Sequence, residues 1–141
     1  MYSWATAERT YEGFPLFLRR PTDVDTAANR DAFSTLAIVT HEFRERLPDG
    51  RPASDYDHSL ADFDHQVVTA FDAAVAGVPV LVETFGGKRN YYFYVLPEAD
   101  LSGVIARLKA SYPLEPVTWE TRPDVDWSFL DRYAKDFFQC A

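Results

Sequence analysis

The fold can be predicted outward from residues 78–96, which read VPVLVETFGGKRNYYFYVL. Two runs rich in β-branched and aromatic residues, 78–85 and 89–96, flank the pair Gly86-Gly87. Both glycines tolerate the positive φ that a tight turn requires, whereas the flanking residues favour an extended backbone. This stretch therefore predicts a β-hairpin.

A helix is predicted on each side of this hairpin. In the preceding segment, apolar residues recur at spacings of three and four and form one stripe: Leu60, Phe63, Val67, Phe71 and Ala74. Ser54 or Asp55 can cap the start of that helix, and Gly77 is in the usual position to end it. Pro97 breaks the second strand, and a second helix is expected over residues 98–111. Its apolar stripe is Leu101, Ile105, Leu108 and Tyr112.

The remaining strands complete a recognisable order. Residues 33–43 alternate between two largely apolar faces, which indicates a central strand covered on both sides. Residues 114–121 predict the last strand, and Pro116 suits a sheet edge because it cannot donate a ladder hydrogen bond. Strand, helix, strand, strand, helix, strand is the order of an α+β split βαβ, or ferredoxin-like, sandwich.

Two additions extend this core at its ends. Residues 3–8 and 14–19 predict an extra N-terminal hairpin, and residues 126–138 repeat apolar side chains as a short packed C-terminal helix would. The sequence contains no linker, internal repeat or low-complexity stretch. Residues 1–141 are therefore predicted to form a single α+β domain.

The charge balance disfavours two classes of partner. The chain carries 22 acidic and 14 basic residues, for a net charge of −8, and this surface repels phosphate backbones and anionic lipid headgroups. We therefore expect neither nucleic acid nor a membrane as a partner.

The single cysteine, Cys140, has no disulfide partner in the chain, and no signal-peptide pattern or membrane-length apolar run is present. A cytoplasmic protein is expected.

Four short stretches occur together in a distinctive order: DGRP at 49–52, TFGGKR at 84–89, YYFY at 91–94 and DVDWS at 124–128. Their order and spacing resemble a bacterial family known only as domain of unknown function 695. The resemblance spans residues 4–133, and its most specific part is the threonine–glycine–arginine–aromatic run of the hairpin. In some bacterial proteins a similar domain is joined to one that resembles a regulator inhibiting ribonuclease E. The resemblance implies the fold and a cytoplasmic setting, and it carries no catalytic residues.

Metal binding is the first chemistry to consider, because His58, Asp62 and His65 lie close together in the sequence. On a helix His58 and His65 are seven residues apart, which separates them by roughly 10 Å along the axis. One ion bound about 2 Å from each ligand cannot bridge that separation. The face that they share lies opposite the apolar stripe, so an exposed polar surface is the better interpretation. We predict no metal and no other cofactor.

Catalysis has little support in the sequence. His41 shares a strand face with Val39 and Phe43, and it could act as a general base. A hydrogen-bonded core histidine is the commoner outcome at such a position. No nucleophile elbow, phosphate-binding loop or dinucleotide-binding motif is present. No catalytic residue is therefore predicted.

The run from Lys88 to Val95 resembles, superficially, an RNA-binding strand. A basic start is followed by alternating aromatic residues, and Tyr92 and Tyr94 would share one face on which bases could stack. The run lacks the glycines of that motif, and the chain is strongly acidic. Aromatic side chains that fill the core are the preferred interpretation.

Arg89 and Asp126 belong to the stretches that carry the family resemblance, and two interpretations fit them. With Thr84 they could bind an anionic or polar ligand. Alternatively, Arg89 and Asp126 pair with each other and hold the C-terminal helix against the hairpin. The pairing is preferred because such ion pairs are common in scaffolds.

Two functions from different classes therefore remain. The first is a non-catalytic protein-binding or regulatory module, whose acidic surface would steer basic partners. The second is a small-molecule-binding or enzymatic site around Thr84, Arg89, Tyr92 and Trp127. A concave pocket in which these side chains converge would favour the second, and a flat apolar patch would favour the first.

Overall fold

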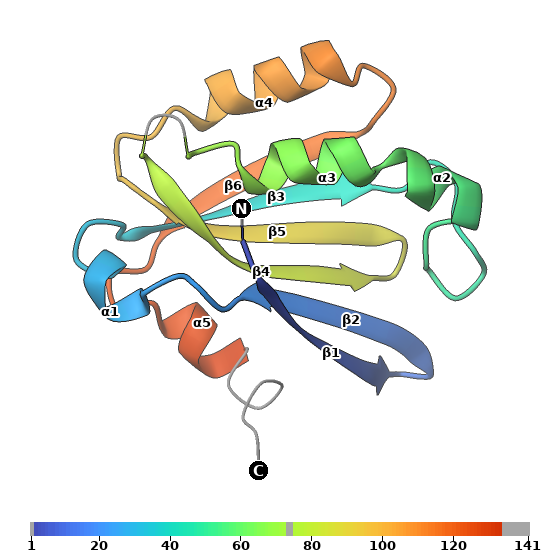
Figure 1. Cartoon of the computed structure of the whole chain (residues 1–141), viewed down its shortest axis with the longest axis horizontal. Helices are drawn as coiled ribbons and strands as arrows, with labels where there is room; N and C mark the ends of the chain where they lie inside the picture. Colours follow the sequence, from blue (N-terminus) through green and yellow to red (C-terminus); the bar gives the residue numbers. More distant parts are fainter. Residues whose placement is uncertain (1, 73–74, 134–141) are drawn as a thin grey trace.

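The computed structural model describes residues 2–72 and 75–133 and has the predicted α+β class. Its strands form one six-stranded antiparallel sheet in the order β1-β2-β4-β5-β3-β6 (Figure 1). The strands are β1 (Trp4–Tyr11), β2 (Phe14–Pro21), β3 (Thr35–Glu42), β4 (Gly77–Phe85), β5 (Lys88–Val95) and β6 (Val117–Pro123). The helices are α1 (Thr26–Asn29), α2 (Ser54–Ser59), α3 (Ala61–Val68), α4 (Leu101–Ser111) and α5 (Ser128–Tyr133).

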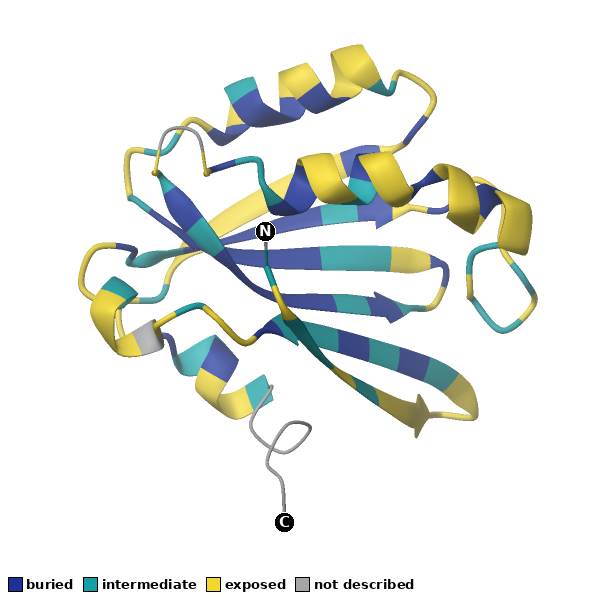
Figure 2. Ribbon diagram, in the orientation of Figure 1, coloured by how far each residue is buried: buried dark blue, intermediate teal, exposed yellow. Residues whose placement is uncertain are grey.

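The sheet is covered on both faces, and each face has its own apolar core (Figure 2). Helices α3 and α4 lie on one face, and α5 lies on the other. The first core joins these two helices to residues of β3, β4, β5 and β6. The second core joins α5 to β2, β3, β4 and β5. Strand β3 shows why both cores form: Ala37 and Val39 enter the first, and Leu36 and Ile38 enter the second.

Several sequence predictions are confirmed in this arrangement. Strand β3 lies between β5 and β6 with cover on both faces, and β6 stands at a sheet edge just after Pro116. The N-terminal hairpin is present, with strands slightly longer than predicted. Helix α5 occupies the start of the predicted C-terminal helix, and the rest of that prediction, residues 134–138, lies outside the described residues.

The predicted helix before β4 differs from the structure in its continuity and its start. A break at Leu60, with φ −89° and ψ −2°, divides the segment into α2 and α3. Ala53 is the N-cap and makes no side-chain capping bond, so the expected cap at Ser54 or Asp55 is wrong. The stripe itself is confirmed at the buried positions Leu60, Phe63, Val67 and Phe71, while Ala74 lies outside the described residues.

The prediction that Gly77 ends a helix is also wrong, because this residue begins β4. Gly77 pairs with Val95 of β5, and a Cβ atom on it would lie 2.6 Å from Val95 Cγ1 and 2.8 Å from the Tyr94 carbonyl oxygen. The glycine is needed because the two strands approach too closely here for any side chain.

Trp127 anchors the chain between β6 and α5. Its side chain is fully buried, its indole Nε1 donates to the Phe33 carbonyl oxygen at 2.7 Å, and its ring stacks on Tyr94 with centroids 4.1 Å apart. Asp124 accepts hydrogen bonds from the Tyr94 hydroxyl at 2.7 Å and from the backbone N–H groups of Ser128 and Phe129 at 3.0 Å. Two of the four family-like stretches, 91–94 and 124–128, therefore meet in the second core.

This anchor gives a first testable prediction. We expect Trp127→Phe to lower the free energy of unfolding by about 1–3 kcal/mol, because the buried Phe33 carbonyl loses its donor. Trp119→Phe is the matched control, since Trp119 is 41% exposed on β6, and we expect a change within about 0.5 kcal/mol. Urea unfolding followed by circular dichroism measures both. Equal effects of the two substitutions would contradict the assigned role of Trp127.

Candidate functional site

A groove lies where the sheet extends beyond its helical cover. The sheet residues buried in the first core belong to β3, β4, β5 and β6, and the hairpin β1–β2 contributes only Trp4, which packs against the core and is partly buried. Strands β1, β2, β4 and β5 form the floor of the groove, and α2 and α3 form its wall. It has a volume of about 480 Å³ and adjoins a second compartment of about 380 Å³ towards loop 47–52. Four residues line both: Phe17, Asp57, Thr84 and Arg89.

The strand register determines which side chains reach this groove. Phe17 pairs with Thr84, Thr84 pairs with Arg89, and Arg89 pairs with His41. Residues directly opposite one another point to the same face, so these four side chains form a row across the sheet. A second row, two residues further along, contains Arg19, opposite Val82, and then Tyr91. The two rows place two arginines on the same face.

Arg89 is held in a defined orientation. Its Nε donates to the Thr84 hydroxyl oxygen at 2.9 Å, and its guanidinium lies 5.3 Å from the centroid of the Phe43 ring. Its terminal nitrogens lie 3.7 Å from Asp57 Oδ1 and 3.7 Å from Asp64 Oδ1, which are ion-pair distances rather than hydrogen bonds. The side chain is 14% exposed. The guanidinium is therefore largely enclosed, and its terminal N–H groups can still bind an acceptor in the groove.

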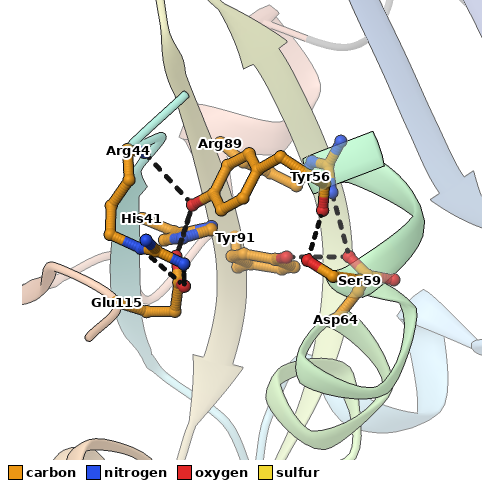
Figure 3. Close-up of polar contacts among 8 residues, drawn as sticks. All are labelled: His41, Arg44, Tyr56, Ser59, Asp64, Arg89, Tyr91 and Glu115. Atoms are coloured by element: carbon orange, nitrogen blue, oxygen red, sulfur yellow. Dashed lines mark hydrogen bonds and ion pairs between the residues drawn. The ribbon is translucent and has the colours of Figure 1, made fainter. Parts of the chain in front are cut away.

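Asp64 connects the wall of the groove to its floor. It accepts a hydrogen bond from the Arg19 guanidinium. It accepts another from the Tyr91 hydroxyl at 2.7 Å, which Figure 3 shows. Burial raises the pKa of Tyr91 above its ordinary value, and the Asp64 carboxylate raises it further, so the hydroxyl keeps its proton. Asp64 thereby ties α3 to β2 and β5.

A second polar cluster lies beside the groove, in which Arg44 is exposed and His41, Tyr56 and Glu115 are buried (Figure 3). Glu115 Oε2 accepts from Arg44 Nε at 3.0 Å and Nη2 at 2.8 Å, and Glu115 Oε1 is hydrogen-bonded to His41 Nε2 at 2.8 Å and to the Tyr56 hydroxyl. The Tyr56 oxygen in turn accepts from the backbone N–H of Arg44 at 3.2 Å. His41 is fully buried, as a hydrogen-bonded core histidine should be, and its Nδ1 has no hydrogen-bond partner among the described residues.

The protonation states in this cluster follow from burial and from the hydrogen bonds. Burial lowers the pKa of His41, and the opposing effect of Glu115 does not restore it. Burial alone would raise the pKa of Glu115, but hydrogen bonds from Arg44, Tyr56 and His41 outweigh it and lower that pKa. Burial, followed by the bond to Glu115, raises the pKa of Tyr56 to about 12. At neutral pH the cluster therefore contains a neutral histidine, an ionised carboxylate and a protonated tyrosine.

The structure brings together some of the predicted site residues and separates the others. Thr84 and Arg89 lie side by side in the groove. Tyr92 and Trp127 belong to the second core on the opposite face of the sheet, where Tyr92 is 8% exposed and Trp127 is fully buried. The condition set for a small-molecule site around these four side chains, that all of them converge on one pocket, is therefore not met. Tyr94 is also fully buried, so the aromatic run fills the core, as preferred, and does not form a stacking surface.

The predicted ion pair between Arg89 and Asp126 is wrong as well. Arg89 lies opposite His41 at one end of β3, whereas the segment before α5 joins the other end, where Asp124 N donates to the Ser34 carbonyl oxygen. Seven residues of strand separate the two ends, or about 23 Å. Arg89 pairs instead with Asp57 and Asp64, as described above. The backbone carbonyl of Asp126 accepts a hydrogen bond from Arg30 at 3.1 Å.

Sequence reasoning missed three charged residues that line the groove, Arg19, Asp57 and Asp64, and the buried Tyr91 that donates to Asp64. A usable signal was present for two of them. Asp57 and Asp64 are seven residues apart, each one position before His58 and His65. Both aspartates line the groove, and both histidines are exposed, as predicted, with His58 at the edge of the adjoining compartment. Arg19 and Tyr91 carried no signal of this kind, because their contact with Asp64 depends on tertiary structure.

Two further family-like stretches meet at the end of the groove. The backbone N–H of Gly87, in stretch 84–89, donates to the carbonyl oxygen of Gly50, in stretch 49–52, at 2.9 Å. A Cβ atom on Gly50, whose φ is +92°, would lie 3.0 Å from backbone atoms of Gly86 and Gly87.

The sequence model of a family of unknown function, DUF695, matches residues 2–133. The chain belongs to this family. Searches of curated proteins and of solved structures found no match.

Two general findings apply to the described part of this DUF695 chain. No group of three or more His, Cys, Asp or Glu residues within 2–72 and 75–133 is arranged to hold a metal ion. No helix in the same ranges is long and apolar enough to cross a membrane. Cys140 lies outside them.

The buried cluster predicts how stability depends on pH. The pKa of His41 in the folded protein is below its ordinary value of 6.5, so the unfolded chain binds the proton more readily. The free energy of unfolding should therefore fall as the pH is lowered through the range below 6.5. Ionised Glu115, whose pKa is also lowered, adds a loss of stability in the acid range below its ordinary value of 4.5.

Urea unfolding at a series of pH values tests this expectation. His41→Gln should make the free energy of unfolding less dependent on pH in the range just below 6.5. His58→Gln, a change on the exposed face of α2, should follow the wild-type profile. A wild-type profile that is flat below 6.5, or one that His58→Gln flattens equally, would contradict the assignment of this dependence to His41.

Asp64 gives a prediction about the groove itself. Asp64→Asn keeps the size of the side chain but removes the charge that Arg19 and Arg89 face, so we expect a loss of about 1–3 kcal/mol in unfolding free energy. Asp55→Asn, on the exposed face of α2, is the control and should cost less than about 1 kcal/mol. In a protein that already carries Asp64→Asn, Arg19→Gln should lower the free energy of unfolding by less than it does in the wild type, because the ion pair is already broken. Additive effects would show that the two residues act independently.

Proposed function

We propose that this chain is a ligand-binding module that holds a small polar molecule in the groove, against Arg89. The observation that carries the proposal is the state of Arg89. Its side chain is 14% exposed and lines a cavity of about 480 Å³ together with Asp57 and Asp64, which lie 3.7 Å from its terminal nitrogens. Small-molecule sites are typically concave, of a few hundred Å³, with apolar walls and a few convergent polar groups. The groove has these properties.

Two contacts prepare Arg89 for such a role before any ligand arrives. The Thr84 hydroxyl accepts from Nε, and Arg89 Cζ lies over the Phe43 ring, so the long side chain has already lost much of its rotamer freedom. A ligand that binds a pre-ordered side chain does not have to offset that entropy. The planar fork then presents parallel N–H donors, which suit a carboxylate or another planar acceptor.

The geometry supports this function better than a protein-binding surface. Exposed large apolar side chains in the described residues come from several separate segments: Tyr11, Phe14, Val75, Leu114, Trp119 and Val125. Of these, Tyr11 and Phe14 are paired across the β1–β2 hairpin. Two adjacent aromatic residues make a small patch compared with a protein interface, which needs about 800 Å² on each partner.

We also infer that β3 to β6 and the helices between them form a split βαβ, ferredoxin-like unit that the N-terminal hairpin widens. The inference is supported by the element order and by the strand order β4-β5-β3-β6 within the larger sheet. A cytoplasmic setting remains part of the proposal, because the single cysteine and the family resemblance both fit a reducing compartment.

An NMR titration of the full chain with a panel of small polar probes tests the proposed function. The panel contains acetate, inorganic phosphate, methylammonium and glycine. We expect at least one probe to give saturable shifts at the amides of Thr84, Arg89 and Asp57. Arg89→Gln should weaken that binding about tenfold or more, because a charge-assisted hydrogen bond is lost.

Arg107→Gln is the matched control, since it removes an exposed arginine of α4 and leaves the groove intact. Its binding curves should equal those of the wild type. Shifts that are scattered over the surface, or that persist in full in Arg89→Gln, would contradict a site at Arg89.

A further inference from the structure

The balance of charge in the groove points to the class of ligand. Two guanidinium groups, those of Arg19 and Arg89, face three carboxylates, those of Asp57, Asp64 and Glu8. The formal sum is therefore −1, from two positive and three negative groups. A simple anion at Arg89 would lie beside like charges, and a simple cation at the carboxylates would lie beside the arginines. Either arrangement weakens binding, because like charges at close range repel.

The groove offers a ligand both hydrogen-bond donors and hydrogen-bond acceptors. Arg89 keeps terminal donors, as shown above. The Asp57 carboxylate contacts Arg89 at 3.7 Å without a hydrogen bond, and its side chain is 52% exposed, so its oxygens can accept from a ligand. Asp64 is more fully committed, because it already accepts from Arg19 and Tyr91. Open donors on Arg89 therefore stand next to open acceptors on Asp57.

The spacing of these two groups selects among zwitterions. Arg89 Nη2 and Asp57 Oδ1 are 3.7 Å apart, so the complementary charges of a ligand must also lie close together. An α-amino acid meets this condition, because its ammonium and carboxylate are attached to the same carbon atom. In a molecule whose charges are separated by a longer chain, one of the two groups would have to leave its partner.

Apolar residues line the groove next to this charged pair. Phe17 on β2, which lies between the two compartments, is half-buried and leaves apolar surface exposed in the groove, beside the buried Leu60 and Val82. A hydrocarbon side chain in contact with them would remove apolar surface from water, which is worth roughly 25 cal/mol per Å². A ligand with an apolar side chain should therefore bind more tightly than glycine.

We propose that the groove binds a free α-amino acid with an apolar side chain, its carboxylate on Arg89 and its ammonium on Asp57. The inference rests on the proposed ligand-binding function and specifies the ligand class of that same site. Both charged groups of the ligand are needed, and each is recognised by a different element: β5 supplies the arginine and α2 supplies the aspartate.

Calorimetric and NMR titrations of the full chain with three matched compounds test the inference. L-Leucine carries both charges, N-acetyl-L-leucine keeps only the carboxylate, and L-leucinamide keeps only the ammonium. We expect L-leucine to bind about tenfold or more tightly than either derivative, because each derivative loses one charge-assisted contact. L-Leucine should also bind more tightly than glycine.

Asp57→Asn tests the contact with the ligand's ammonium separately from the contact of its carboxylate with Arg89. It should weaken L-leucine binding about tenfold and leave N-acetyl-L-leucine binding unchanged or improved, because it removes only the partner of the ammonium. Asp55→Asn, two residues away on the same helix, is the matched control and should bind all three compounds as the wild type does. Urea unfolding of both variants verifies that the fold is retained.

Failure of the amino-acid inference can be distinguished from failure of the proposed ligand-binding function. N-Acetyl-L-leucine or L-leucinamide binding as tightly as L-leucine would overturn the amino-acid inference and leave a groove that recognises a single charge. Binding of acetate or phosphate at Arg89, with none of the three leucine compounds binding, would overturn the ligand class and keep the proposed function. If neither these compounds nor the small polar probes shift the groove amides, both proposals are overturned.

Discussion

The pairing of β2 with β4 is the constraint on which the groove depends. Its register sets Phe17 opposite Thr84 and Arg19 opposite Val82, while Leu16 and Leu18 face the second core. A slip of one residue would turn every side chain of β2 to the other face of the sheet. The same register that completes the core on one face thus places the aromatic ring and the guanidinium of β2 in the groove on the other.

The buried cluster around Glu115 positions the wall of that groove. Tyr56, on α2, is hydrogen-bonded to Glu115 and precedes Asp57 directly in the sequence, so the contact that holds Tyr56 also places the Asp57 carboxylate. In a medium of low dielectric constant, hydrogen bonds to a buried ionised group are strong, and leaving that group without partners is costly. Arg44, His41 and Tyr56 together satisfy Glu115. We infer that the cluster is a scaffold whose rigidity the binding site uses.

Sequence reasoning succeeded where the determinants are local and failed where they are not. Alternation in β3 and the glycine turn between β4 and β5 gave the strands and their order along the chain, and Thr84 and Arg89 face each other because that turn is tight. The contact of Arg19 with Asp64 spans 45 residues and follows from sheet register, which no local pattern reveals. Gly77 was misassigned because helix ends and close strand pairs both select glycine. Arg89 and Asp126 both lie in family-like stretches, yet these stretches meet opposite ends of β3.

The strand order leaves β1 and β6 at the two ends of the sheet, where unpaired backbone groups could template the addition of a strand from another chain. Strand β6 is exposed from Thr118 to Pro123, and it carries charges at Glu120 and Arg122. Strand β1 is exposed from Glu8 onward and carries both an acidic and a basic residue. Burying these charges against a neighbouring strand would be costly, and Pro123 offers no N–H for a ladder. Both edges of the sheet thus resist edge-to-edge aggregation.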